Sequence, residues 1–120
     1  MSDTIQPIPS LVARKPTEFS IHLAAYLTAV SAYETHCAAQ EPPNEEDPLW
    51  FAYENSYGAL VSAMHEAGIE AIKAPAVSGE EIVAKLTIFR AQDYRASEPE
   101  VIKLLLDAMI ADGVRIGGAA

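Results

Sequence analysis

The fold is decided by residues 17–39, TEFSIHLAAYLTAVSAYETHCAA, in which large side chains recur at helical spacing. Steps of four, three, four, three and four residues join its apolar members, which are Phe19, Leu23, Tyr26, Val30, Tyr33 and Cys37. Side chains at this spacing lie on one face of an α-helix. Pro42 and Pro43 then end the helix, because proline has no backbone N–H to continue it. The stretch predicts a helix from about Thr17 to Ala39, with Cys37 as a buried, inert thiol.

A second apolar stripe predicts a second helix. Its members follow each other at three or four residues and are Trp50, Tyr53, Tyr57, Leu60 and Met64. Asp47 is suited to cap the start, and Pro48 to occupy the first helical position, where its missing N–H costs nothing. We therefore expect a helix from Asp47 to about Ile72, stopped by Pro75.

Two further helices begin with similar signals. Ser78 is followed three residues later by Glu81, a capping box, and Ser97 with Glu100 repeats the pattern. The last helix is apolar around much of its circumference, through Val101, Ile102, Leu104, Leu105, Leu106, Met109 and Ile110. Such a helix is normally central in its domain or covered by another chain.

Four helices joined by short connections predict an all-α fold, an antiparallel four-helix bundle made of two helical hairpins. With 120 residues, we expect one bundle domain over residues 17–114. Three prolines predict an extended arm over residues 1–16, and glycines predict a flexible tail over residues 115–120. The expected core anchors are Phe19, Leu23, Trp50, Leu60, Met64, Leu86, Phe89 and Leu105.

Charge is concentrated in one part of the chain. The formal net charge is -9, and residues 41–70 hold seven acidic groups with no Lys or Arg. An acidic balance, and a last helix without a polar recognition face, argue against direct nucleic-acid binding. The acidic stretch is either a solvated loop or a docking edge for a basic protein partner; its residues are Glu41, Glu45, Glu46 and Asp47.

No pattern of catalytic residues is present in the sequence. It contains no glycine-rich nucleotide loop, no nucleophile elbow and no His-Glu-x-x-His motif. A single cysteine permits neither an intramolecular disulfide nor a thiolate zinc cluster. His22 and His36 lie about 21 Å apart along one helix, too far to share a metal ion. We expect a non-enzymatic protein without a cofactor or metal.

Four tyrosines lie on the two facing stripes, Tyr26 and Tyr33 on the first and Tyr53 and Tyr57 on the second. Their hydroxyls must form hydrogen bonds or remain in water. The seam is therefore an ordinary hairpin core with hydroxyls at its rim, or a cleft for a partner or a small ligand. In the second interpretation, His36 and His65 complete the cleft and offer nitrogen ligands to a metal ion.

The N-terminal sequence is acidic and interrupted by proline, unlike a signal peptide. The longest uncharged apolar run, residues 19–33, is too short to cross a bilayer. We therefore expect a cytoplasmic protein with no membrane partner.

Residues 71–86, AIKAPAVSGEEIVAKL, resemble a segment of small uncharacterised helical bacterial proteins. In those proteins an Ala-Ile-x-x-Pro-Ala turn precedes a capped helix that ends in Lys-Leu. Their final helix ends with Ala-Asp and an apolar residue, similar to residues 110–114 here. Many are found in prophage or mobile-element neighbourhoods. The resemblance covers about a third of the chain, implies a helical bundle and brings no catalytic residues with it.

These observations favour a helical protein-interaction module, a homodimer that acts as a small bacterial adaptor or regulator. One alternative is a small-ligand or metal-binding bundle that uses the tyrosine and histidine cleft. A second is an acidic inhibitor of a nucleic-acid-binding partner.

Overall fold

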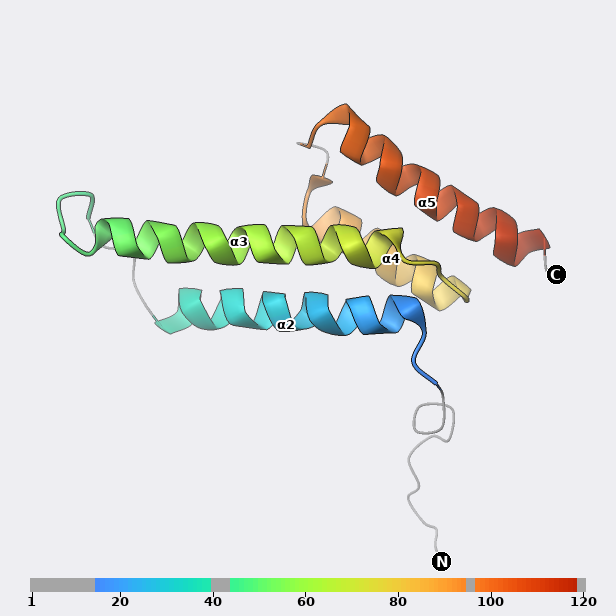
Figure 1. Cartoon of the computed structure of the whole chain (residues 1–120), viewed down its shortest axis with the longest axis horizontal. Coiled ribbons are helices and arrows are strands. Elements are labelled where there is room, and N and C mark those ends of the chain that lie inside the picture. The colour runs from blue at the N-terminus through green and yellow to red at the C-terminus, as the bar shows by residue number, and fades with distance from the viewer. Residues whose placement is uncertain (1–14, 40–43, 95–96, 119–120) are drawn as a thin grey trace, which may run out of the picture.

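The computed structural model describes residues 15–39, 44–94 and 97–118, and these ranges contain four α-helices and no strand (Figure 1). The helices are α2 (Glu18–Ala39), α3 (Trp50–Lys73), α4 (Gly79–Ala91) and α5 (Pro99–Gly118). The predicted all-α class is confirmed. Of the expected N-terminal arm, residues 1–14 lie outside the described residues, and Lys15 and Pro16 are not helical.

The start of α2 is held by two neighbouring side chains. The Ser20 N–H donates to Thr17 Oγ1 at 2.9 Å, and the Thr17 N–H donates to Ser20 Oγ at 2.8 Å. This reciprocal pair satisfies two backbone donors that the first turn of a helix leaves free. It places Thr17 immediately before the helix, close to the predicted start.

The expected start of α3 is wrong by two residues, because the first helical residue is Trp50 rather than Pro48. Asp47 does not cap the helix directly, because its carboxylate accepts the Leu49 N–H at 2.8 Å and its carbonyl accepts the Trp50 N–H at 2.9 Å. Residues 47–49 thus form a turn of the kind that aspartate favours through its own side chain. The helix begins only after this turn, at Trp50.

The capping box of α4 is present in a modified form. Ser78 Oγ accepts the Glu81 N–H at 3.2 Å, as predicted. The Glu81 carboxylate reaches one residue further back, accepting the Val77 N–H at 2.9 Å and the Thr17 hydroxyl at 2.8 Å. One glutamate therefore joins the start of α2 to the link between α3 and α4.

Helices α2 and α3 lie side by side and run in opposite directions (Figure 1). Ring contacts confirm this direction, because Tyr33 meets Tyr57 while the later His36 meets the earlier Tyr53. Helix α5 contacts α3 and α4 and lies on the other side of α3 from α2 in this view. The complete antiparallel four-helix bundle stays a prediction.

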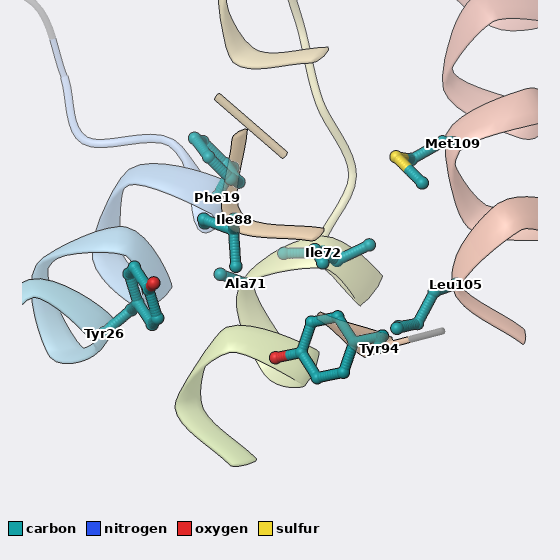
Figure 2. Close-up of a cluster of buried hydrophobic side chains, with 9 residues drawn as sticks. Phe19, Tyr26, Ala71, Ile72, Ile88, Tyr94, Leu105 and Met109 are labelled. Atoms are coloured by element: carbon teal, nitrogen blue, oxygen red, sulfur yellow. The ribbon is translucent and has the colours of Figure 1, made fainter. Parts of the chain in front are cut away.

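The apolar core lies at one end of the α2–α3 pair, where α4 and α5 join it. Phe19, Ile72 and Leu105 are fully or almost fully buried there, together with Tyr94. Figure 2 shows Leu105 and Met109 pointing from α5 toward Ile72 of α3. This cluster takes no member from α2 beyond Val30 or from α3 before Met64. The other half of the helix pair therefore lies outside the described core.

The expected core anchors fall into three groups. Phe19 and Leu105 are buried, and three others pack against the cluster while partly exposed: Leu23, Met64 and Phe89. Trp50 and Leu60 are half-buried outside the cluster. The expectation for Leu86 is wrong, because its side chain is 50% exposed. Its neighbour Lys85 occupies the inward position of α4 instead.

The expected flexible tail is also corrected for the residues described. Helix α5 continues to Gly118, beyond the predicted domain boundary at residue 114. Arg115 holds this last part of the helix by donating to Asp112 Oδ1 at 2.8 Å and to the Ala76 carbonyl.

Gly68 allows α3 to approach its neighbours closely, which predicts the effect of Gly68→Ala. A Cβ at Gly68 would collide with the Tyr94 hydroxyl and come within 3.1 Å of Ile88. Alanine gains about 1 kcal/mol of helix propensity, but overpacking costs about 1–3 kcal/mol. We expect a net destabilisation of about 1 kcal/mol in urea unfolding monitored by circular dichroism.

Gly58→Ala is the matched control in the same helix, because a Cβ at Gly58 meets nothing within 4 Å. This control should stabilise the protein by up to about 1 kcal/mol. Equal effects of the two substitutions would contradict the close approach at Gly68.

Candidate functional site

Four of the six residues of the expected cleft meet at the end of the α2–α3 pair away from the core. We call Tyr33, His36, Tyr53 and Tyr57 the aromatic cluster. The His36 ring stacks on Tyr53 with centroids 5.1 Å apart, and Tyr53 stacks on Tyr57 at 6.2 Å. The Tyr33 and Tyr57 hydroxyl oxygens are 3.4 Å apart. The predicted facing of the two stripes therefore holds for Tyr33, Tyr53 and Tyr57, and His36, which belongs to neither stripe, joins them.

Tyr26 and His65 do not join the aromatic cluster, so the six-residue cleft is corrected. Tyr26 is buried in the core, where its hydroxyl accepts a hydrogen bond from Gln92 Nε2 at 2.9 Å. His65 packs against Tyr94 with ring centroids 4.5 Å apart. The physical reason is distance along the helix, because two helical turns, about 10 Å, separate Tyr26 from Tyr33.

Two hydroxyls of the aromatic cluster have a raised pKa, those of Tyr33 and Tyr53. The hydrogen bond with Tyr57 raises the pKa of Tyr33, and the Cys37 thiol adds to this rise. Burial raises the pKa of Tyr53, and the nearby Cys37 and Tyr57 raise it further. Neutral phenols donate and accept hydrogen bonds but are poor nucleophiles. The cluster is therefore suited to binding rather than to covalent chemistry.

Cys37 is exposed rather than buried, which corrects the expectation from the stripe. It lies in the last turn of α2, in the half of the helix pair outside the core cluster. A position on an apolar stripe is buried only where another element covers it.

A shallow, open depression lies on the surface of α2 and reaches His36 of the aromatic cluster. Its lining is mostly methyl groups and hydroxyls, from Leu27, Thr28, Ser31, Ala32, Thr35 and His36. The His36 Nε2 atom is buried and has no hydrogen-bond partner among the described residues. A small ligand on this surface would find hydroxyls and methyl groups, whereas the buried Nε2 atom becomes accessible only if the His36 ring moves away from Tyr53.

Within the described ranges, no group of three or more His, Cys, Asp or Glu side chains is arranged to hold a metal ion. His36 by itself supplies one nitrogen ligand, whereas stable protein zinc sites use three or four protein ligands. The aromatic cluster therefore fits a neutral or weakly polar ligand better than a metal ion.

The acidic docking edge is described in part. Glu45 and Glu46 are exposed, Asp47 is half-buried in its turn, and Glu41 lies outside the described residues. Glu45, Glu46 and Asp47 precede α3 in the chain, and the first turn of the helix contains no acidic residue. Glu45 and Glu46 are therefore the described groups that a basic partner can reach.

A buried ion pair, which the sequence analysis missed, joins α4 to α5. Lys85 Nζ donates to Asp112 Oδ2 and to the Ala74 carbonyl, and the side chains of Lys85 and Asp112 are 0% and 2% exposed. Asp112 Oδ1 also accepts the Ala76 N–H at 3.0 Å and Arg115 Nη2 at 2.8 Å. We call these residues the buried ion-pair network. It ties the link between α3 and α4 to both following helices.

Burial of Asp112 raises its pKa, but hydrogen bonds from Lys85, the Ala76 N–H and Arg115 outweigh this effect and lower it. Lys85 Nζ also lies 5.9 Å from the centre of the Phe19 ring, within cation–π range. Because each charged group has hydrogen-bond partners within the fold, the network is suited to a structural role rather than to binding a substrate.

A signal for this network is present in the periodicity. Asp112 follows Leu105 and Met109 by seven and three residues, so it continues the buried stripe of α5. Lys85 precedes the buried Ile88 by three residues in the same way. A charged residue on a buried stripe indicates a partner of opposite charge on another element.

Comparison of the chain with protein-family models, with curated proteins and with solved structures finds no match in any of the three. The resemblance of residues 71–86 to small helical bacterial proteins therefore stays a prediction. None of the described helices is both long and apolar enough to cross a lipid bilayer.

Proposed function

We propose that this protein is a non-enzymatic helical interaction module, a small bacterial adaptor or regulator that works as a homodimer in the cytoplasm. The observation that carries the proposal is the exposure of large apolar side chains on all four helices. Examples are Ile21 on α2, Phe51 on α3, Val83 on α4 and Ile110 on α5, each at least 60% exposed. Where such side chains form a contiguous patch, the patch marks a site of protein association.

The proposal keeps the antiparallel four-helix bundle of two hairpins as the fold of each copy. In the homodimer, a second chain would bury apolar faces that one copy leaves in water. It also includes a basic protein partner for the acidic docking edge. Seven acidic groups without Lys or Arg in residues 41–70 support attraction to a basic surface.

Light scattering on the purified full chain tests the homodimer. The apparent mass should rise from 12.9 kDa toward twice that value as the concentration increases to tens of micromolar and beyond. A mass that stays at 12.9 kDa throughout this range would remove the homodimer from the proposal.

Neutralising the acidic edge tests the basic partner. In Glu45→Gln combined with Glu46→Gln, we expect weaker capture of basic proteins from the native host than by the wild type. Glu98→Gln combined with Glu100→Gln removes the same charge from another exposed segment and serves as the control. Unchanged capture by the variant with Glu45→Gln and Glu46→Gln would contradict the role of the acidic docking edge.

The second candidate function is small-ligand or metal binding, favoured by the unpartnered His36 Nε2 atom beside the aromatic cluster. Elemental analysis of tag-free protein tests the metal form of this hypothesis. A stoichiometric metal that His36→Ala removes would rank it above the interaction module. The third candidate, an acidic inhibitor of a nucleic-acid-binding partner, rests on the exposed Glu45 and Glu46 alone.

A further inference from the structure

Two large apolar side chains are exposed where the turn over residues 44–49 enters α3. Leu49 is 68% exposed, and Phe51, in the first turn of α3, is 72% exposed. The start of α3 lies at the end of the helix away from α4 and α5 (Figure 1), and the core cluster takes no residue of α3 before Met64. We call Leu49 and Phe51 the apolar anchors.

Local contacts hold the apolar anchors in place. The Asp47 N–H donates to the Asn44 carbonyl at 2.9 Å, and the Asp47 carboxylate accepts the Leu49 N–H at 2.8 Å. The Phe51 ring packs edge-on against Trp50, with ring centroids 5.2 Å apart. A segment that is ordered before it binds loses less conformational entropy on association. The apolar anchors are therefore suited to recognition.

Carboxylates flank the apolar anchors. Glu45 and Glu46 precede them in the chain, Glu54 follows Phe51 by about one helical turn, and all three are exposed. Residues 16–72 contain nine acidic residues and no Lys or Arg, whereas eight acidic residues balance eight basic ones in the rest of the chain. The whole formal net charge of -9 therefore belongs to residues 16–72, which comprise α2, its connection to α3 and nearly all of α3.

This charge selects the kind of surface that can cover the apolar anchors. A second copy would bring the same carboxylates to the contact, and nucleic acids and anionic lipid surfaces are repelled in the same way. A basic protein surface is attracted, and complementary charge increases the rate and the specificity of association. The exposed Val83 of α4 and Ile110 of α5 differ, because they lie in the balanced part of the chain, where charge favours no class of partner.

We propose that the apolar anchors and the carboxylates beside them form one docking surface for a basic protein. The partner presents an apolar patch that covers Leu49 and Phe51, bordered by Lys or Arg side chains that pair with Glu45, Glu46 and Glu54. An apolar centre within a polar rim is the usual anatomy of a protein interface. This proposal rests on the basic partner of the proposed function and adds the apolar part of the contact. Two anchors make a small contact, so binding is transient and weakened by salt.

The experiment uses the full chain and a synthetic amphipathic peptide of leucine and lysine, which presents an apolar face bordered by lysines. A second peptide has glutamate at every lysine position, and a third has serine at every leucine position. Trp50 is the only tryptophan in the sequence and lies against Phe51, so its emission reports binding at this surface. We expect the leucine–lysine peptide to shift the Trp50 emission at low salt, and the other two peptides to bind roughly tenfold more weakly or less.

Matched variants separate the apolar part of the surface from the charged part. Phe51→Ser removes an anchor, whereas Val114→Ser removes an apolar side chain of nearly equal exposure from α5, 72% against 70%. Fluorescence anisotropy of the dye-labelled leucine–lysine peptide gives the dissociation constant without relying on Trp50. We expect Phe51→Ser to raise this constant by roughly tenfold and Val114→Ser to leave it unchanged. Leu49→Ser should act like Phe51→Ser and provides a second variant should Phe51→Ser disturb the fold.

The charged part has its own variant. Glu45→Gln combined with Glu46→Gln should raise the dissociation constant of the leucine–lysine peptide at low salt. At high salt the difference from the wild type should become small, because salt screens exposed charges.

Three results would overturn the proposal. A leucine–lysine peptide that binds no better than its glutamate counterpart removes the basic partner of the proposed function together with this surface. Lysine-dependent binding that neither Phe51→Ser nor Leu49→Ser weakens removes only the apolar anchors, and the basic partner stands. Weakening by Val114→Ser alone places the contact on α5 instead.

Discussion

Replacing Asp112 with alanine is expected to destabilise the protein by about 3–5 kcal/mol, because Lys85 would remain buried without its partner. The Lys85 side chain is 0% exposed, and its Nζ atom donates directly to Asp112 Oδ2 in the ion pair between α4 and α5. The measurement is urea unfolding at neutral pH, followed by circular dichroism. Asp107→Ala is the control in the same helix, because it breaks an exposed ion pair with Lys103 and should change the stability little.

A double substitution separates the loss of charge from the loss of packing. Lys85→Met combined with Asp112→Leu removes both charges and keeps apolar volume, and such replacements are often neutral or stabilising. The double variant should therefore be more stable than Asp112→Ala. A double variant as unstable as Asp112→Ala would show that packing, or the lost hydrogen bonds to the Ala76 N–H and the Ala74 carbonyl, outweighs the buried charge.

Acid should weaken the same network. The pKa of Asp112 is lowered in the folded protein from its ordinary value of 3.8, so its contribution to stability is complete above that value. The contribution is lost as the pH falls through the lower folded value. The difference in unfolding free energy between the wild type and Asp112→Asn should therefore be constant near neutral pH and shrink below about pH 4. A difference that does not change with acid would contradict an ionised Asp112.

Replacing Tyr94 with alanine is the second substitution with a large expected effect, a loss of about 3–5 kcal/mol. The side chain is fully buried, and its ring packs against His65 at 4.5 Å and Phe89 at 5.7 Å between centroids. Its hydroxyl donates to the His65 carbonyl at 2.8 Å. The preceding residue, Asp93, has a φ of 51°, in the left-handed region that aspartate adopts more readily than most residues.

Two comparisons sharpen this prediction in urea unfolding experiments. Tyr94→Phe keeps the ring and removes one hydrogen bond, so it should cost only about 1 kcal/mol. Trp50→Ala should cost less than Tyr94→Ala, because Trp50 is half-buried outside the core cluster. A larger loss for Trp50→Ala would place the main core at the other end of the helix pair.

Tyr94→Phe should also reduce the cost of Gly68→Ala. The hydroxyl that a Cβ at Gly68 would strike is absent from phenylalanine. The two substitutions are therefore not additive, and the double variant should be more stable than the sum of the single effects predicts.

The local chemistry of the sequence was sufficient for the four helices and for most of their boundaries. The 3–4 spacing of residues 19–37 predicted α2, and Ser78 with Glu81 predicted the start of α4. Asp47 shows the limit of this reasoning, because its side chain forms a turn with Leu49 that competes with a direct helix cap.

The candidate site was predictable only where both partners lie on facing stripes. Tyr33 and Tyr57 met as the pattern predicted, whereas Tyr26 and His65 were separated from them by their distance along the helices. Tyr94 was missed because it lies in a connection, where periodicity gives no information about burial.

The sequence by itself determined the all-α class and the concentration of acidic groups in residues 41–70, because helical spacing, capping and charge depend on residues close together in the chain. Only the tertiary structure decided which faces are covered. Leu86 is half exposed and Lys85 is buried. Lys85 can be buried because its ammonium group pairs with the carboxylate of Asp112, 27 residues later. Leu106 and Ile110 of α5 remain exposed although they are apolar, since burial depends on which elements meet in space rather than on the pattern of one helix.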